Sequence, residues 1–357
     1  MIQTEFNPNE PGVPNGNYFA LPWSVEEADI VLLSVPWDVT ASYRPGTHRG
    51  PKAMVDASVQ IDLFDPLVPN AWDIRIGTLP ALRGVEKKNK VVRKAAETVF
   101  GAWERGEKGG NATEVVNRAC EELNNLVYKT AKEQLMQGKR VGVVGGEHSV
   151  PLGLIRALCD QYESFGILHI DAHADLRCAY EGFTYSHASI MYNAIRLPQV
   201  HTLVQAGVRD YCQEEAGLMA ASTSIHCFTD QALRQALFMG DSWRQLCNCM
   251  IDKLPDHVYI SFDIDGLTPD LCPHTGTPVP GGLSFREADY LLHTLAVSGK
   301  KVIGFDLCEV APEEDGKNEW DANVGARLLY KLCCYSHLNQ TVHLNLADTG
   351  KVSTFAP

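Results

Sequence analysis

Two carboxylates and an imidazole alternate directly after an apolar run in the middle of the chain. The run spans residues 165–170 and has the length and branched side chains of a buried parallel strand. The three ionisable residues are Asp171, His173 and Asp175. Alternate residues of an extended segment point to the same side, so these side chains should converge. Acids and an imidazole gathered at a strand end need neutralisation, and a divalent metal ion bound by Asp and His is the usual solution.

Two further apolar runs lead into residues of the same kind. The run 258–262 precedes Asp263 and Asp265, and the run 141–144 precedes a Gly-Gly-Glu sequence and His148. Six ligands are too many for an ordinary mononuclear site, and four aspartates balance the charge of two divalent cations. The sequence therefore predicts a binuclear metal centre where three strands end.

The bulk composition is that of a globular protein and excludes several other classes. The chain has 357 residues, of which 45% are hydrophobic and 21% are charged. A net charge of -13 argues against a nucleic-acid partner. There is no apolar run of membrane-spanning length and no signal peptide, so we expect no membrane association. Eleven cysteines are scattered without disulfide or zinc spacing, which favours reduced thiols and a cytoplasmic location.

Apolar runs and amphipathic segments alternate over most of the chain. This alternation predicts a mostly parallel sheet flanked by helices, with ligands bound beyond the carboxyl ends of the strands. A helix is expected over 113–137, with Thr113 as its N-cap and Gly138 as its stop. The other expected helices are 152–159, 188–195 and 232–246, and the other expected strands are 29–36, 202–208, 225–228 and 301–307.

The ends of the chain and two loops are interpreted separately. Residues 1–27 form an N-terminal arm rich in Pro and Gly that packs on the body or on a neighbouring subunit, 28–340 form one catalytic domain, and 341–357 form a C-terminal tail. The loop 37–51 is long and turn-rich, of a kind that often lines a site. Lysines and arginines gather in 84–110. Such a run of charges is usually a solvated helix face, and we favour that interpretation over a functional basic patch.

Five short motifs together resemble those of a known family. They are Gly145–Ser149, Asp171–Asp175, Ser261–Gly266, Thr275–Gly282 and Asp306–Val310. In this order they resemble the ureohydrolases, the family of arginase and agmatinase, over roughly residues 28–335. The resemblance implies an arginase-like, three-layer α/β/α fold with a central, mostly parallel sheet. It also implies hydrolysis of a guanidinium group by a metal-bridging hydroxide, with release of urea.

The resemblance implies a role for each ligand. His148 and Asp175 would hold one metal ion, and His173 and Asp265 would hold the other. Asp171 and Asp263 would bridge them. The two ions would be manganese, with nickel as the alternative that some relatives use.

Three more residues match positions that act on the substrate in this family. Glu309 would pair with the guanidinium group, and a carboxylate forking onto two N–H donors would hold the carbon in place. His187 would shuttle a proton to the leaving amine. Thr277 would donate or accept a hydrogen bond at the substrate.

Departures from the family pattern restrict the range of expected substrates. Arginase has an asparagine where this chain has Arg177, which disfavours arginine as the substrate. The segment 319–327, with Trp37 near the mouth of the site, resembles the guanidine hydrolase branch. We therefore expect a small guanidino substrate: guanidine, agmatine or a guanidino acid. Relatives are commonly trimers or hexamers, so a homotrimer or homohexamer is expected.

Two other classes of function fit parts of the same pattern. One is a deacetylase-like amidohydrolase with a single zinc ion, which needs fewer ligands. The other is a non-catalytic metal-binding scaffold, which would not need Glu309 together with all six ligands. Four other histidines are interpreted as structural or left without a role: His48, His169, His226 and His274.

Overall fold

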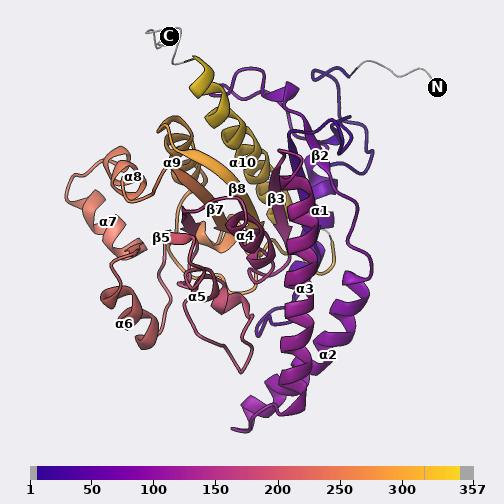
Figure 1. Ribbon diagram of the computed structural model, residues 1–357, viewed down its shortest axis with the longest axis vertical. Coiled ribbons are helices and arrows are strands. Elements are labelled where there is room, and N and C mark those ends of the chain that lie inside the picture. The colour runs from indigo at the N-terminus through magenta and orange to yellow at the C-terminus, as the bar shows by residue number, and fades with distance from the viewer. Residues whose placement is uncertain (1–5, 317, 346–357) are drawn as a thin grey trace.

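Eight strands form one parallel sheet in the computed structural model of the chain (Figure 1). The structure describes residues 6–316 and 318–345, with side chains as far as residue 338. The strands are β1 (Ile30–Val35), β2 (Ile76–Thr78), β3 (Arg140–Gly145), β4 (Phe165–Ile170), β5 (Val200–Ala206), β6 (Ile225–Phe228), β7 (His257–Asp263) and β8 (Lys301–Cys308). Their order is β2-β1-β3-β8-β7-β4-β5-β6, and every described pair is parallel.

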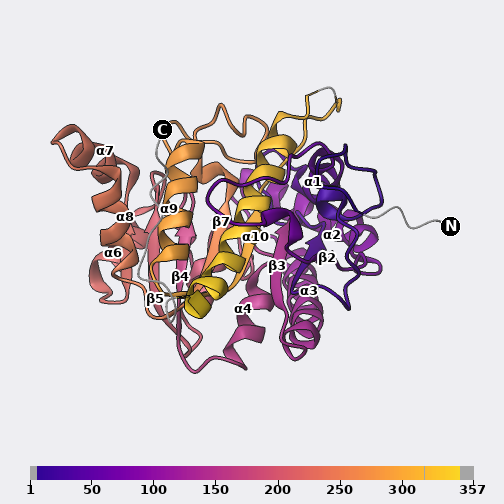
Figure 2. The ribbon, with the colours of Figure 1, turned by 90° about the horizontal axis from the view of Figure 1, so that it is seen from above.

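Helices cover both faces of this sheet. They are α1 (Gly50–Ser58), α2 (Val85–Glu104), α3 (Asn111–Leu135), α4 (Leu152–Cys159), α5 (Ile190–Ala194), α6 (Gln213–Ala221), α7 (Asp230–Phe238), α8 (Trp243–Ile251), α9 (Phe285–Val297) and α10 (Trp320–Asn345). One core layer joins the sheet to α1, α8, α9 and α10, and the other joins it to α2, α3, α4 and α5. Figure 2 shows α9 and α10 lying along one face. The predicted three-layer α/β fold is confirmed.

The four central strands are apolar because both of their faces are covered. All six residues of β3 and of β4 are buried, as are the last six of β7 and the last seven of β8. A strand buried on both sides cannot alternate polar and apolar residues, so it reads as a continuous hydrophobic run. These runs made the strands recognisable in the sequence, and they end together at one edge of the sheet.

The predicted element bounds hold where a clear break ends a pattern. The strands 165–170 and 225–228 and the helix 152–159 have the predicted bounds. The single helix expected over 232–246 is wrong: it is α7 and α8, because Gly240 has a φ of 107° and Ser242 caps a new helix. Thr113 is not an N-cap, since α3 begins at Asn111.

The N-terminal segment packs on the body of the molecule. The ring of Phe19 lies 5.1 Å from that of Tyr330 in α10, and the hydroxyl of Tyr18 lies 2.7 Å from Ser34 Oγ in β1. At the other end, α10 continues past the predicted boundary at residue 340, and residues 346–357 lie outside the described part. The domain limits remain a prediction. Within the described residues, no helix has the length and apolar character needed to cross a membrane.

Candidate metal centre and substrate cavity

Three of the four central strands deliver the predicted metal ligands to one edge of the sheet. His148 follows β3, Asp171 follows β4, and Asp263 is the last residue of β7. Because β3, β8, β7 and β4 are consecutive neighbours, their carboxyl ends meet. All six predicted metal ligands are brought together there. Five of them are buried, and His173 is half-buried.

Two groups of ligand atoms share one carboxylate. In the first group, His148 Nδ1 lies 3.0 Å from Asp171 Oδ2, 3.5 Å from Asp175 Oδ2 and 3.3 Å from Asp263 Oδ2. In the second, His173 Nδ1 lies 3.4 Å from Asp171 Oδ1 and 3.1 Å from Asp265 Oδ2. Asp171 therefore turns one oxygen to each group.

This donor set fits two divalent cations. Carboxylate oxygens and imidazole nitrogens suit manganese and nickel alike. Four buried aspartates would repel one another in a protein interior, and two divalent cations balance their charge. Two overlapping sets have the composition and spacing of metal sites: His148, His169, Asp171 and Asp175 form one, and Asp171, His173 and Asp265 form the other.

Burial raises the pKa of two acids of the cluster. Burial, followed by the charge of Asp171, raises the pKa of Asp175 from 3.8 to about 6. Burial and the charges of Asp265 and Asp171 likewise raise the pKa of Asp263 well above its ordinary value. Asp175 also has a φ of 53°, a conformation that is uncommon outside glycine. Strained backbone and perturbed carboxyls together are typical of a functional site.

A buried network behind His148 orients its ring. His148 Nε2 lies 2.9 Å from Ser261 Oγ, which donates to Asp306 Oδ2 at 2.8 Å. The hydroxyl of Tyr259 donates to the same carboxylate oxygen at 2.7 Å. These contacts occupy Nε2, so Nδ1 is left to face the aspartates.

His169, interpreted from sequence as a structural histidine, is buried and hydrogen-bonded, but its partner is a predicted ligand. Its Nε2 lies 2.8 Å from Asp171 Oδ2, and its Nδ1 lies 2.9 Å from Gln205 Nε2. Strand alternation carried a signal for this contact, because residues two apart in β4 point to the same side.

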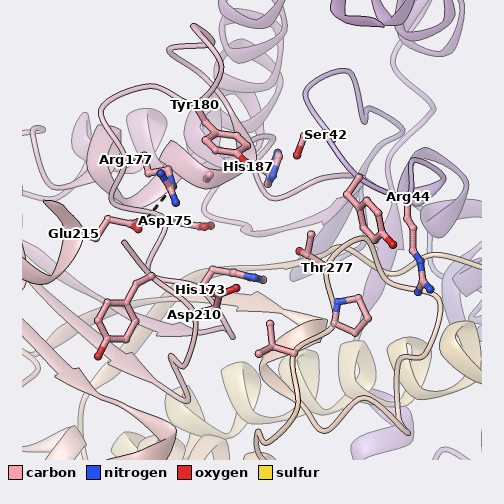
Figure 3. Close-up of a pocket in the computed structure, with 15 residues that line it drawn as sticks. Ser42, Arg44, His173, Asp175, Arg177, Tyr180, His187, Asp210, Glu215 and Thr277 are labelled. Carbon is pink, nitrogen blue, oxygen red and sulfur yellow. Dashed lines mark ion pairs between the residues drawn. The ribbon is translucent and has the colours of Figure 1, made fainter. Parts of the chain in front are cut away.

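A cavity of about 430 Å³ opens onto the cluster (Figure 3). His173 and Asp175 line it, together with the predicted substrate residues His187 and Thr277. The loop 37–51 contributes Ser42, Tyr43 and Arg44, which confirms that this loop lines a site. Other walls come from residues that the sequence did not indicate: Tyr180, Asp210, Tyr211 and Glu215.

Arg177 lies in the wall of this cavity. Its guanidinium carbon is 4.9 Å from the centre of the Tyr180 ring, and its Nε is 3.8 Å from Glu215 Oε2. Glu215 is buried and is held by the backbone N–H groups of Leu176 and Cys212. The ion pair fixes a cation and its counter-ion beside the space where a substrate tail would lie.

His187 reaches the cavity from the loop before α5. Its backbone N–H donates to Thr40 Oγ1 at 3.2 Å, and the Thr40 N–H donates to the buried Glu147 at 2.9 Å. Burial, followed by the nearby His173, lowers the pKa of His187 to about 4. The imidazole is therefore neutral at pH 7 and can accept a proton.

Glu309 is buried close to the loop that carries Thr277 and is not among the described residues that line the cavity. Only 8% of it is exposed, and its Oε1 accepts a hydrogen bond from the backbone N–H of His148 at 2.8 Å. Burial, followed by the charge of Glu147, raises the pKa of Glu309 well above its ordinary value. A Cβ atom at Gly276 would lie 3.6 Å from Glu309 Oε2, so the loop that carries Thr277 passes over this carboxylate.

The expectation for Trp37 is wrong. Trp37 is fully buried in the hydrophobic core instead of lying near the mouth of the site. The aromatic residues that line the cavity are Tyr43, Tyr180 and Tyr211. The position of an aromatic residue in the sequence near site residues does not reveal which way its ring points. The ring of Trp37 points into the hydrophobic core.

Comparison with known proteins decides the family. The family model described as "Arginase family" matches residues 28–334. The chain belongs to the arginase family. It is similar to N(1)-aminopropylagmatine ureohydrolase of Thermus thermophilus, with 33% identity over 306 residues, 85% of this chain and 89% of that protein. It is also 29% identical to the agmatinase of Bacillus subtilis over 308 residues, 86% of this chain and 91% of that one.

The fold agrees with this membership of the arginase family. The crystal structure of agmatine ureohydrolase of Thermoplasma volcanium superposes with a TM-score of 0.69 at 22% identity, over 90% of this chain and 94% of that one. The protein is thus an agmatinase-like ureohydrolase of the arginase family, and the predicted resemblance is confirmed.

Proposed function

We propose that this protein hydrolyses a small guanidino compound, either guanidine, agmatine or a guanidino acid, and releases urea with ammonia or an amine. The observation that carries the proposal is the placement of Asp171, whose two oxygens face His148 and His173 separately. A single ion would not need a carboxylate that serves two groups of ligands. The names of the similar proteins, agmatinase and N(1)-aminopropylagmatine ureohydrolase, support the choice of a guanidino substrate.

The six acids and imidazoles of the cluster would hold two divalent ions, Mn²⁺ in the first instance and Ni²⁺ as the alternative. His148 and Asp175 would serve one ion, His173 and Asp265 the other, and Asp171 and Asp263 both. When bound, such a pair supplies a hydroxide nucleophile at neutral pH, because it lowers the pKa of a shared water.

The remaining residues would bind and orient the substrate. Glu309 Oε1 is already bonded to the His148 N–H, and Oε2 has no hydrogen-bond partner among the described residues. Oε2 would therefore accept the guanidinium N–H groups, and the fixed carboxylate would hold the carbon in position. Thr277 would add a hydrogen bond from the cavity wall.

His187 would move the proton that the leaving amine needs. Because its ring is neutral at pH 7, it can take a proton and pass it on to the amine nitrogen. Thr40 holds the backbone of His187, so the ring is carried on a fixed point at the cavity wall.

The cavity suits a short substrate. Its volume of about 430 Å³ lies at the small end of ligand sites. Arg177 repels a positive charge at the far end of a substrate, whereas its partner Glu215 attracts one. The pair is therefore compatible with agmatine and with a guanidino acid. Free guanidine needs neither of these two side chains.

A combined metal and substrate assay tests the proposal. Purified protein loaded with Mn²⁺ or with Ni²⁺ should hold two ions per subunit and release urea from at least one member of a panel of guanidine, agmatine and guanidino acids. A further sample loaded with Zn²⁺ and given an acetylated amine tests the deacetylase-like alternative, which one zinc ion per subunit and release of acetate would favour. Bound metal without urea release from any member would favour a non-catalytic scaffold.

We further propose that the protein is a homotrimer or homohexamer, as its family membership suggests. Light scattering coupled to size-exclusion chromatography measures the molar mass directly. A monomer would contradict this part of the proposal and leave the assignment of the site untouched.

A further inference from the structure

A second cavity lies at the opposite end of the sheet from the metal ligands. Its wall includes Arg140, His257 and Lys301, which are the first residues of β3, β7 and β8. The same three strands carry predicted site residues at their other ends. With six to eight residues per strand, the two sites are roughly 20 Å apart. The cavity has a volume of about 440 Å³, and none of the described residues in its wall is an aspartate or a glutamate.

Arg140 is a buried cation without a carboxylate partner in the described part of the chain. Only 7% of it is exposed, and the one hydrogen bond that its guanidinium makes within the described residues runs from Nε to the backbone oxygen of Val302 at 3.0 Å. Asp29, directly before the neighbouring strand β1, accepts the backbone N–H of Arg140 through its backbone oxygen at 2.9 Å, but its carboxylate is occupied by two hydrogen bonds from Arg75, at 2.6 and 2.9 Å. Burial lowers the pKa of Arg140 to about 10, so the group is still charged at pH 7.

Two more cations border the same cavity, and neither is paired with an acid in the part of the chain that the structure describes. Lys139 is 8% exposed, and its ammonium donates to the backbone oxygens of Val25 and Glu26. Lys301 is exposed, and its ammonium has no partner among the described residues. A buried guanidinium beside two further cations is costly unless a negative charge compensates it.

Neutral donors complete the wall. Tyr162 and His257 lie with their ring centres 4.9 Å apart, and both line the cavity. Burial, followed by the charge of Lys301, lowers the pKa of His257, so this ring is neutral at pH 7. The exposed Asp256 lies next to His257 in the chain, but it is not part of the wall.

We propose that this cavity binds a small, multiply charged oxyanion, with Arg140 as its central ligand and Lys301 at its rim. The planar guanidinium donates two parallel hydrogen bonds to phosphate or carboxylate oxygens. The volume exceeds what one phosphate ion fills, so a small molecule that carries a phosphate or several carboxylates also fits. The anion neutralises the buried charge of Arg140 at the start of β3, and its binding stabilises the fold.

Isothermal titration calorimetry on the full-length, metal-loaded protein tests this site. The probes are inorganic phosphate, pyrophosphate and citrate, at constant ionic strength in a buffer without oxyanions. We expect saturable binding of at least one probe and a melting temperature that rises with its concentration. Phosphate or pyrophosphate ahead of citrate would identify a phosphate ligand, and the reverse order a polycarboxylate. No saturable binding of any probe would overturn the proposal.

Variants separate this cavity from the metal centre, which could also bind phosphate. Arg140→Gln should abolish binding of the probe, and Lys301→Gln, a change at an exposed residue, should weaken it about three- to tenfold. Lys253→Gln is the matched control, because Lys253 is an exposed lysine outside the cavity wall, and it should bind the probe like the unaltered protein. Urea release should be the same in Lys301→Gln and Lys253→Gln. Unaltered binding in Lys301→Gln would overturn the proposal even if Arg140→Gln fails to fold.

Discussion

The backbone N–H of His148 donates a hydrogen bond to Oε1 of Glu309 at 2.8 Å. This bond joins a predicted metal ligand to the carboxylate proposed to bind the guanidinium group. It fixes one oxygen of Glu309 and leaves the other without a hydrogen bond among the described residues. The φ of 63° at Glu309 indicates that the backbone is strained to hold this side chain in place.

Replacing Glu309 by glutamine should separate substrate binding from metal binding. The amide oxygen can still accept the His148 N–H, so the fold and the metal content should be retained. The ionic pairing with guanidinium is lost, and we expect kcat/KM to fall about 10- to 100-fold or more. Urea release and metal content of Glu309→Gln, measured on the same sample, check this. Near-normal turnover would show that Glu309 does not bind the substrate.

Asp263→Asn should act on the metals first. Asp263 Oδ2 lies 3.3 Å from His148 Nδ1, while Oδ1 accepts the backbone N–H of Asp265 at 2.9 Å. The amide keeps the size of the side chain but removes a charge that would serve both ions. We expect fewer than two metal ions per subunit and loss of urea release. Asp241→Asn, a change at an exposed aspartate, is the control and should retain two metal ions per subunit and urea release. Two tightly bound ions in Asp263→Asn would contradict the bridging role.

The gathering of the six predicted ligands at the strand ends could be predicted from the sequence because their signals are local. A buried strand followed by acids at alternate positions, as at Asp171, His173 and Asp175, specifies both direction and face. The agreement at β4 and α4 has the same origin, since sharp breaks end both patterns. The expected helix 232–246 failed because one glycine and one capping serine, Gly240 and Ser242, outweigh helical periodicity over a short span.

The outer part of the cavity could not be predicted in the same way. Glu215 comes from α6 and meets Arg177 only through the fold, and Asp210 reaches the wall after β5. No local pattern marks such contacts. The position of Trp37 in the sequence predicts a place near the mouth of the site. Its large apolar side chain is instead buried in the core.

His169 should tune metal binding without being a ligand. Gln205 Nε2 lies 2.8 Å from the backbone oxygen of Ala174, which can only accept, so this contact fixes the orientation of the amide. Its second hydrogen then points to His169 Nδ1 at 2.9 Å, and the proton of the ring must be on Nε2, facing Asp171. An Nε2–H group donates to Asp171 and cannot coordinate a metal ion.

We therefore expect His169→Phe to keep two metal sites and to weaken metal affinity about 10- to 100-fold, as is usual when a residue that supports a ligand is lost. Competition with a chelator of known affinity measures this. His226→Phe, at a histidine in the edge strand β6, is the matched control and should leave the affinity unchanged. Complete loss of one ion in His169→Phe would show that His169 is itself a ligand.

The stabilisation that metals provide should grow with pH because of Asp175. Its pKa is about 6 in the folded, metal-free protein, against 3.8 for an ordinary aspartate. Between these values the folded state holds a proton that the unfolded chain has lost, so this group destabilises the metal-free fold as pH rises through the window. Metal binding needs the deprotonated carboxylate and becomes stronger over the same range. The difference in melting temperature between metal-loaded and EDTA-treated protein should therefore widen from pH 5 to pH 7. In metal-free Asp175→Asn, the contribution of this group to the pH dependence of stability should disappear. If the difference in melting temperature between the metal-loaded and the EDTA-treated unaltered protein stays constant or narrows from pH 5 to pH 7, the raised pKa is contradicted.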